Sequence, residues 1–381
     1  MKRKQREMVL AGILLVLSLA GCGNSSEKTS QLETTSISEE TKVQEIESQS
    51  ETPAGVEETA FEEEFKPNEY EKALGITKEI KESFIAKYDK DTYDNAVLYN
   101  YYILYMKSAN RVGDFEADKI GDCIMLPMEV TSSRDSHVIP GDYIIHDEEV
   151  KHDIVIILPG IGCHRRTATG AISALFNLGY DVWCMDLPGF GENGSDLSTY
   201  GILEQYDLED VIKYIRETLQ VSNPIYLYGY SYGAGVCAVS LQNKTVLSNI
   251  SAVIMDSPFS SMEAFVRLNL GGYMLNGSND EEVFGYLNDM ERMLLGADMS
   301  SANGIDIIKK ADIPVLIFTS EADKVIPASE AQQLYDAAKC ENKKIVVFGE
   351  AKHTDAINSE HDEYVSILQE FLNSIELFAA D

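Results

Sequence analysis

A short stretch of glycine, tyrosine and serine holds the first residues that could do chemistry. It reads GYSYG from Gly229 to Gly233 and places one serine, Ser231, between two glycines. A serine hydroxyl is a poor nucleophile at neutral pH, so it needs a base that takes its proton and a carboxylate that orients the base. The pattern also arises by chance, and the same serine could instead cap a helix. Its interpretation depends on the rest of the chain.

Among the six histidines, His353 lies where such a base is needed. It ends the loop GEAKH, directly after the apolar run 344–348. His361 is expected inside the last helix. His164 follows an earlier strand and is expected to be a loop or substrate contact. Cys163 beside His164 is not favoured as a nucleophile and base, because adjacent side chains rarely point at each other productively.

Two aspartates compete for the role of the carboxylate. Asp323 stands in FTSEADKVIP, just after the strand expected at 315–319, and Asp256 stands in VIMDSP, one strand earlier. Glu321 is a third, weaker candidate. Asp323 is favoured, because the loop after the later strand can reach a histidine on the next one.

These residues are positioned by an alternation of apolar strands and helices. Strands are expected at 153–158, 180–185, 224–228, 251–255, 315–319 and 344–348, and helices at 167–178, 200–219, 232–242, 328–338 and 359–378. Such alternation predicts an α/β fold with a mostly parallel sheet covered on both faces, which binds ligands at the carboxyl ends of its strands. Ser231 then lies in a strand-turn-helix context, where Gly229 and Gly233 permit a tight turn.

The remaining segments divide the chain into further parts. Residues 68–120 are expected to form an N-terminal helical extension, and residues 121–381 the main domain. Within that domain the alternation breaks down at about 257–312, where Met and aromatic residues at helical spacing indicate a small helical cap insertion. A cap over the strand ends would shape a substrate pocket.

The first residues have the features of a targeting signal. A basic start, MKRKQRE, precedes an apolar run from Met8 to Gly21 that is too short to span a bilayer. The run ends in LAGC, which resembles the lipobox of bacterial lipoproteins, although an ordinary secretory signal would also end in small residues. Residues 1–21 are therefore expected to be a signal peptide, Cys22 the lipidated residue, and 22–67 a disordered acidic tether.

The net charge of −32 excludes some classes of partner. So acidic a chain is not expected to bind nucleic acid or to grip anionic lipid through a basic patch. The cysteines have no C-x-x-C spacing, and no metal site is indicated.

Five motifs together resemble the α/β-hydrolase fold superfamily from about Met128 to the C-terminus. They are LPGIG at 158–162, DLPGFGENGSD at 186–196, GYSYG at 229–233, SEADKVIP at 320–327 and AKH at 351–353. The DLPGFG stretch is typical of the branch that contains serine aminopeptidase-like and lysophospholipase-like hydrolases.

The resemblance implies a catalytic triad of Ser231, Asp323 and His353. It also implies an oxyanion hole made by the backbone N–H groups of Tyr232 and Ile161, and no metal or organic cofactor. Tyr232 is expected to act through its N–H, with a side chain that tolerates change better than Gly233. Where many relatives have His-Gly, this chain has Pro159-Gly160, so the oxyanion loop is expected to be held differently.

The resulting hypothesis is a membrane-tethered serine hydrolase on the extracytoplasmic face of a bacterial cell membrane. It would cleave a small-molecule carboxylic ester through an acyl-enzyme, with Cys22 as the lipid anchor. One alternative is an exopeptidase acting on short peptides. Another is a non-catalytic surface-binding protein on the same fold. The sequence predicts neither the acyl group nor the oligomeric state.

Overall fold

The computed structural model describes residues 65–105, 123–147, 152–269 and 280–379. The predicted signal peptide at 1–21, the lipidation site Cys22 and nearly all of the tether at 22–67 lie outside these residues, as does the end of the helical extension at 106–120. In the described ranges no helix combines the length and the apolar character that crossing a membrane requires.

The chain builds an eight-stranded sheet in the order β1-β2-β4-β3-β5-β6-β7-β8. The strands are β1 Cys123–Thr131, β2 Val138–His146, β3 Ile154–Leu158, β4 Asp181–Met185, β5 Ile225–Tyr230, β6 Ala252–Asp256, β7 Val315–Ser320 and β8 Lys343–Phe348. β1 pairs antiparallel with β2, and β2 antiparallel with β4, while all later neighbours pair in parallel. The predicted mostly parallel sheet is therefore confirmed.

The central strands are apolar on both faces, which is why they form continuous hydrophobic runs in the sequence. Along β3, Ile154 and Ile156 face one hydrophobic cluster, whereas Val155 and Ile157 face another. All four are at most 1% exposed. Strands buried on both sides need a covering layer of helices on each face.

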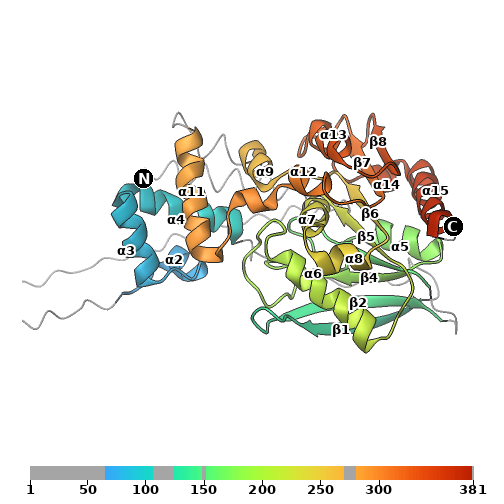
Figure 1. Ribbon diagram of the computed structural model, residues 1–381, viewed down its shortest axis with the longest axis horizontal. Helices are drawn as coiled ribbons and strands as arrows, with labels where there is room; N and C mark the ends of the chain where they lie inside the picture. Colours follow the sequence, from blue (N-terminus) through green and yellow to red (C-terminus); the bar gives the residue numbers. More distant parts are fainter. Residues whose placement is uncertain (1–64, 106–122, 148–151, 270–279, 380–381) are drawn as a thin grey trace, which may run out of the picture. The chain divides into compact units, whose positions relative to one another are not determined.

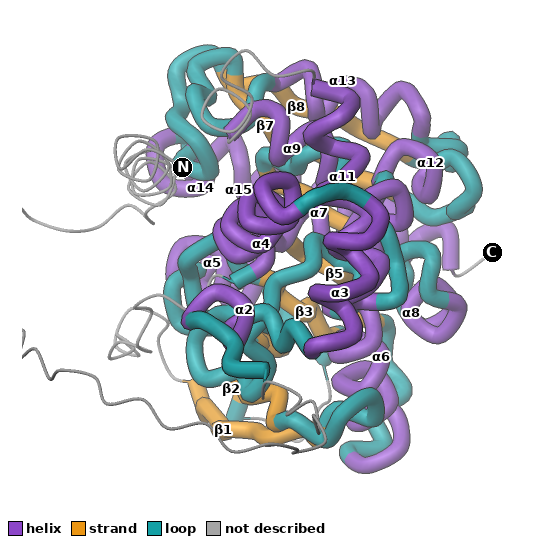
Figure 2. Tube along the Cα trace, turned by 90° about the vertical axis from the view of Figure 1, so that its left-hand side faces the viewer, coloured by secondary structure: helices purple, strands orange, loops and turns teal. Residues whose placement is uncertain are grey.

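Helices supply both layers, as Figures 1 and 2 show. The helices of the main domain outside the predicted insertion are α5 Thr169–Asn177, α6 Glu204–Lys213, α7 Tyr232–Ser240, α8 Lys244–Asn249, α13 Ala328–Ala337, α14 Ala356–Ser359 and α15 His361–Ala379, with a π-helix, η2, at Tyr214–Thr218. Side chains of α5, α14 and α15 join one cluster, and those of α6, α7 and α13 join the other.

One helix differs from the sequence prediction. The helix expected over 200–219 begins only at Glu204, because Tyr200 and Gly201 have φ values of 56° and 99°. A Cβ added at Gly201 would lie 2.5 Å from the Val239 side chain, so the backbone passes close to α7 at this point. The first residues of the predicted helix are therefore a constrained loop.

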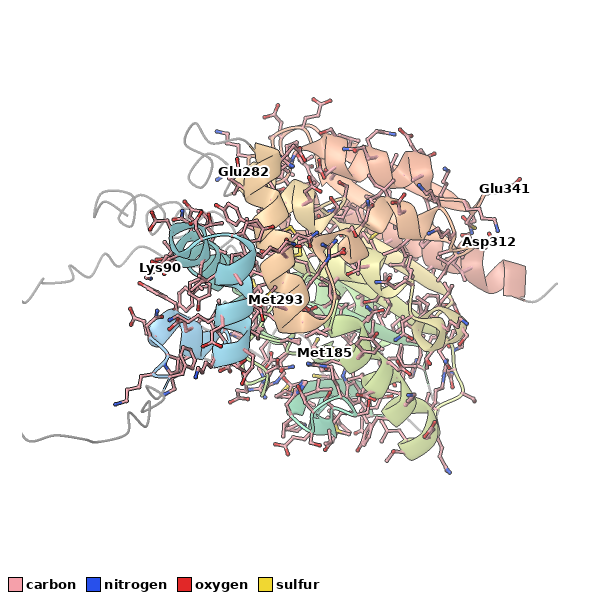
Figure 3. The ribbon with its side chains drawn as sticks, turned by 60° about the vertical axis from the view of Figure 1, so that its left-hand side comes forward. Lys90, Met185, Glu282, Met293, Asp312 and Glu341 are labelled. Carbon is pink, nitrogen blue, oxygen red and sulfur yellow. The ribbon has the colours of Figure 1, made fainter. Side chains whose placement is uncertain are left out.

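Helices from two distant parts of the sequence lie side by side. Before the sheet come α2 Glu69–Ala73, α3 Lys78–Lys87 and α4 Lys90–Leu104, and the segment between β6 and β7 contains α9 Met262–Asn269, α11 Asp280–Leu295, the 3₁₀ helix η3 Met299–Ala302 and α12 Gly304–Ile308. α4 packs along α11, and Figure 3 shows the two helices together, with Lys90 on one and Met293 on the other.

Candidate active site

Ser231 occupies a strained turn between β5 and α7. Its φ of 53° and ψ of −117° belong to a region that side chains rarely adopt. A Cβ at Gly229 would lie 2.4 Å from the Gly233 carbonyl oxygen, and one at Gly233 would lie 2.0 Å from the Leu158 carbonyl oxygen. The two glycines are therefore required by close backbone approach, as the sequence predicted.

The serine side chain contacts a histidine and does not cap the helix. Ser231 makes no side-chain cap to α7, and its Oγ lies 2.8 Å from Nε2 of His353. On the other side of the ring, Nδ1 lies 2.7 Å from Oδ2 of Asp323. With a proton on Nδ1 that donates to this carboxylate, Nε2 is left to accept the serine proton.

Asp323 is itself held by the backbone of its own loop. Its second oxygen, Oδ1, accepts hydrogen bonds from the N–H groups of Val325 at 2.8 Å and Ile326 at 3.0 Å. Ser320 Oγ at the end of β7 donates to the carbonyl of Ala351, two residues before His353. The loops after β7 and β8 are thus joined where they present the acid and the base.

Asp256, the rival acid, is close to the site but differently engaged. It is buried at the end of β6, where it accepts hydrogen bonds from Ser257 Oγ and Tyr364 OH, both at 3.0 Å. Burial raises its pKa to about 6, although these hydrogen bonds favour the charged form. The structure therefore brings Asp323, not Asp256, into contact with His353, and the third candidate, Glu321, is exposed.

Two backbone N–H groups near Ser231 are left without an acceptor. Among the described residues, the N–H groups of Tyr232 and Ile161 enter no hydrogen bond with the protein. Tyr232 follows Ser231, and Ile161 lies in the loop after β3. A Cβ at Gly160, next to Ile161, would lie 3.4 Å from the Ser231 Cβ, so this loop runs directly beside the serine. Unused buried donors at this position are available to a ligand oxygen.

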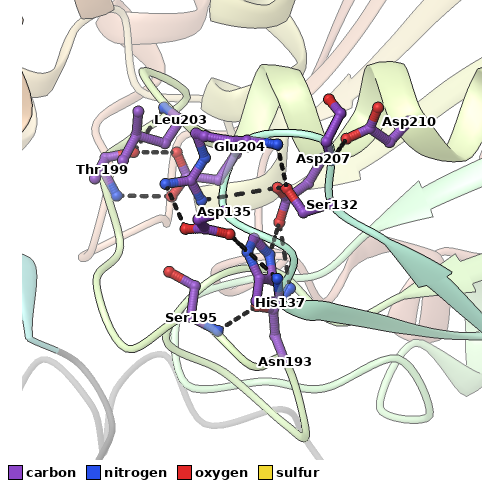
Figure 4. A network of polar contacts seen from close by, with 12 residues as sticks. Ser132, Asp135, His137, Asn193, Ser195, Thr199, Leu203, Glu204, Asp207 and Asp210 are labelled. Carbon is purple, nitrogen blue, oxygen red and sulfur yellow. Dashed lines mark hydrogen bonds and ion pairs between the residues drawn. The ribbon is translucent and has the colours of Figure 1, made fainter.

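The side chain of Tyr232 has a larger structural role than the sequence indicated. Its ring is fully buried, and its hydroxyl donates to Glu204 Oε1 at 2.7 Å and accepts from the Tyr200 N–H at 2.9 Å. Glu204 also accepts from Thr199 N–H and Oγ at 2.6 Å and from the Gly201 N–H at 2.8 Å (Figure 4). That this side chain tolerates change better than Gly233 stays a prediction, but its loss would remove one hydrogen-bond donor from a buried carboxylate.

His164 lies in the loop after β3, as predicted, but does not form a pair with Cys163. Its Nδ1 accepts the Arg166 N–H at 3.2 Å, and burial lowers its pKa, which favours the neutral ring. Cys163 is buried in the hydrophobic cluster beneath α5. Among the described residues no group of three or more His, Cys, Asp or Glu side chains is placed to hold a metal.

Sequence reasoning missed the tyrosine that precedes Ser231 and the glutamate at the start of α6. The hydroxyls of Tyr230 and Tyr232 reach two different loops, and Glu204 is the acceptor for one of them. The signal was present: two tyrosines flank a serine in a turn where small residues would suffice. Their partners could not be read from the sequence, because they are 28 and 63 residues away.

Comparison with known proteins agrees with this architecture. A family model described as alpha/beta hydrolase fold matches residues 153–276. The uncharacterized protein YfhR of Escherichia coli (strain K12) is 30% identical over 207 residues, which are 53% of this chain and 64% of YfhR. The uncharacterized protein YqkD of Bacillus subtilis (strain 168) is 23% identical over 222 residues, or 58% of this chain and 71% of YqkD. The chain spans less than two thirds of the length of YfhR.

The solved structures that resemble the chain lead to the same class. The Pyrococcus furiosus esterase Pf2001 superimposes with a TM-score of 0.56 at 20% sequence identity, covering 70% of this chain and 98% of that one. At this identity the likeness concerns the fold. Taken with the sheet order and the turn at Ser231, these matches define an α/β fold in which a central parallel sheet presents a strand-turn-helix serine. The chain has the α/β-hydrolase fold, and its residues 153–276 match the family model of that description.

Proposed function

We propose that the protein is a serine hydrolase that cleaves a carboxylic ester through an acyl-enzyme intermediate. One observation carries the proposal: a continuous series of contacts from Ser231 Oγ to His353 Nε2 at 2.8 Å and from His353 Nδ1 to Asp323 Oδ2 at 2.7 Å. The side chains of His353 and Asp323 are only 4% and 0% exposed, so the contact between them is shielded from water. This is the geometry that nucleophilic catalysis by a serine requires.

The proposed reaction has two halves. Ser231 Oγ attacks the ester carbonyl carbon while His353 Nε2 takes its proton, and the N–H groups of Tyr232 and Ile161 bind the negative oxygen. His353 then gives the proton to the departing alcohol as the carbon–oxygen bond breaks. Water repeats the sequence on the acyl-enzyme, and Ser231 is released. Asp323 keeps the proton on Nδ1 throughout and stabilises the imidazolium.

Labelling and turnover test this proposal. Purified protein should react with a fluorophosphonate probe and hydrolyse p-nitrophenyl esters, with short and long acyl chains distinguishing the acyl preference. Ser231→Ala should abolish both, while its unfolding transition stays cooperative. Equal labelling of wild type and Ser231→Ala, or no labelling of folded wild type, would contradict the assignment. The second result would favour the non-catalytic binding protein.

The exopeptidase alternative has its own outcome in the same experiment. Labelling of Ser231 without ester turnover, together with release of the terminal residue from short peptides, would identify the substrate as a peptide. The chemistry of the three side chains is the same for both substrates, because an amide also passes through a tetrahedral oxyanion.

We further propose that Cys22 carries a lipid that tethers the protein to the extracytoplasmic face of a bacterial membrane. The support is the sequence alone: a basic start, a short apolar run and LAGC at 19–22. Cells grown with a clickable palmitate analogue should label the wild-type protein and not Cys22→Ser. Equal incorporation into both proteins would contradict lipidation at Cys22.

A further inference from the structure

The tyrosine before Ser231 places its hydroxyl in the loop that follows β3. Tyr230 is the last residue of β5, and its side chain is buried. Its hydroxyl oxygen lies 3.0 Å from Thr167 Oγ1, and its ring lies against Gly160. Gly160 stands near the start of this loop and Thr167 near its end. One side chain therefore joins both ends of the loop.

The direction of each hydrogen bond follows from the number of protons available. Thr167 Oγ1 donates its one proton to the His164 carbonyl oxygen at 2.6 Å. It must therefore accept from Tyr230, whose own proton is then used. The series Tyr230 O–H to Thr167 to the His164 carbonyl therefore uses the protons of both hydroxyl groups.

Gly160 is the residue whose conformation decides where the Ile161 N–H points. Its neighbour Pro159 has no N–H and no polar side chain with which to anchor the loop. Glycine itself is conformationally permissive, and the peptide that carries the Ile161 N–H is held on its carbonyl side, where the Gly160 oxygen accepts from the Cys163 N–H at 3.1 Å. The Tyr230 ring also packs against Gly160, because a Cβ there would lie 3.0 Å from a ring carbon.

We propose that Tyr230 is a positioning residue of the oxyanion site. Its ring supports the turn at Gly160 and its hydroxyl holds the far end of the loop at Thr167, and together they keep the Ile161 N–H beside Ser231 for the negative oxygen of acyl transfer. This inference rests on the proposed function. The Pro159-Gly160 sequence offers the loop no polar side chain that could anchor it. Tyr230, at the end of the strand that leads to Ser231, supplies that support.

Tyr230→Phe removes the hydroxyl and keeps the ring. We expect kcat for a p-nitrophenyl ester to fall about 10- to 100-fold, less than for loss of a whole oxyanion donor, with KM changed less than about 2-fold. Affinity for a trifluoromethyl ketone with the same acyl group should fall by the same factor as kcat/KM, since its adduct carries the oxyanion. A merely structural role would not produce this correspondence.

Tyr226→Phe is the matched control. Tyr226 lies on the same strand and is 1% exposed, but its hydroxyl donates to Asp153 Oδ2 at 3.3 Å, away from Ser231. It should lose comparable stability and keep both kcat and ketone affinity. Thr167→Val removes the acceptor of the Tyr230 proton and should also lower kcat, by a smaller factor. If Tyr230→Phe does not fold, the kcat of Thr167→Val tests the inference in its place.

The inference is overturned if Tyr230→Phe keeps wild-type kcat, or loses kcat while ketone affinity is unchanged. It is equally overturned if the loss of kcat/KM in Tyr230→Phe comes from a higher KM alone. The same holds if Tyr226→Phe shows the same losses of kcat and ketone affinity. Failure of the proposed function is a separate result: it appears as hydrolysis that persists in Ser231→Ala, whatever Tyr230→Phe does.

Discussion

His353 stands near two aspartates that the sequence offers for one role, and the structure gives them different partners. Asp323 contacts Nδ1 of the imidazole, whereas Asp256 is bound by Ser257 and Tyr364. Only a carboxylate in contact with Nδ1 can hold the ring in the tautomer that leaves Nε2 free to accept a proton. The position of each loop, more than the acidity of its residue, determines which aspartate contacts His353.

Replacing each aspartate in turn by asparagine should show which of the two is the carboxylate that orients His353. Asp323→Asn is expected to lower kcat/KM for a p-nitrophenyl ester by about 10³- to 10⁴-fold, because the amide favours the wrong tautomer. Asp256→Asn should lower it less than about 10-fold, since the amide oxygen can still accept from Tyr364. Steady-state kinetics on the two folded variants measure this. A larger loss in Asp256→Asn would transfer the role of the acid to Asp256.

At the scale of elements, the sequence predicted the strands well and the loops poorly. The expected strands at 153–158 and 224–228 correspond to β3 at Ile154–Leu158 and β5 at Ile225–Tyr230, because buried strands are recognised by their continuous apolar runs. The helix expected to begin at Tyr200 begins only at Glu204, for a reason that no local sequence pattern reveals. The Glu204 side chain accepts a hydrogen bond from the loop before it, and Gly201 lies against Val239 of α7.

The turn between β1 and β2 provides a prediction about pH. His137 contacts Asp135 through Nδ1 and Asp207 of α6 through Nε2 at 2.8 Å, with Arg134 beside both acids (Figure 4). Burial alone would lower the His137 pKa, but the hydrogen bonds with Asp207 and Asp135 outweigh it and raise the pKa. The charged imidazole of His137 therefore links the β1–β2 turn to α6 through its contacts with Asp135 and Asp207.

A group with a raised pKa stabilises the folded state fully below its unfolded pKa of about 6.5, and this contribution is lost as the pH rises through the folded value. His137→Gln should lower the free energy of unfolding by about 1–3 kcal/mol at pH 6 and by less at pH 9. Urea unfolding at both pH values measures it, with His361→Gln, whose ring contacts a backbone carbonyl, as the control. An equal loss at both pH values would contradict the role of the charge.

Helix α11 carries a buried carboxyl group that is unpaired within the described part of the chain. Glu291 is completely buried, and neither of its oxygens has a hydrogen-bond partner among the described residues. Burial, assisted by the nearby Asp298, raises its pKa well above the ordinary value. The unfolded chain releases this proton from about pH 4.5 upward while the folded protein retains it, so stability falls as the pH rises above that value.

Glu291→Met should therefore raise the free energy of unfolding at pH 7.5, by about 1–4 kcal/mol. The gain should be smaller at pH 5, where both states of the wild type keep more of the proton. Glu282→Gln on the exposed side of the same helix is the control and should change little (Figure 3). Destabilisation by Glu291→Met at both pH values would indicate that the carboxyl group has a partner.

At the scale of the whole molecule, the excess of acidic residues should act on stability. A net charge of −32 places like charges around one fold, and their mutual repulsion favours the unfolded state. Raising sodium chloride from low concentration to about 0.3 M shortens the range of that repulsion, so Tm should rise by a few degrees. Differential scanning calorimetry measures it. A Tm that falls with salt would mean that the surface ion pairs outweigh the repulsion.

The order of elements and the residues that meet near Ser231 could be predicted from the sequence because both follow from local patterns. Ser231, Asp323 and His353 each follow a strand, and a parallel sheet gathers the ends of its strands. Their catalytic roles stay a prediction. The supports of the site could not be predicted, because Tyr230, Tyr232 and Glu204 act through contacts between loops whose packing no periodicity encodes.

The backbone at Ser231 implies that the proposed activity and the stability of the fold make opposite demands on a single residue. With φ at 53° and ψ at −117°, only glycine would occupy this position without strain. Ser231→Gly should therefore be more stable than Ser231→Ala by about 1–2 kcal/mol, the reverse of the usual order for these residues. Comparing the two inactive variants by urea unfolding would measure the free energy that the fold gives up to present a side chain at this turn.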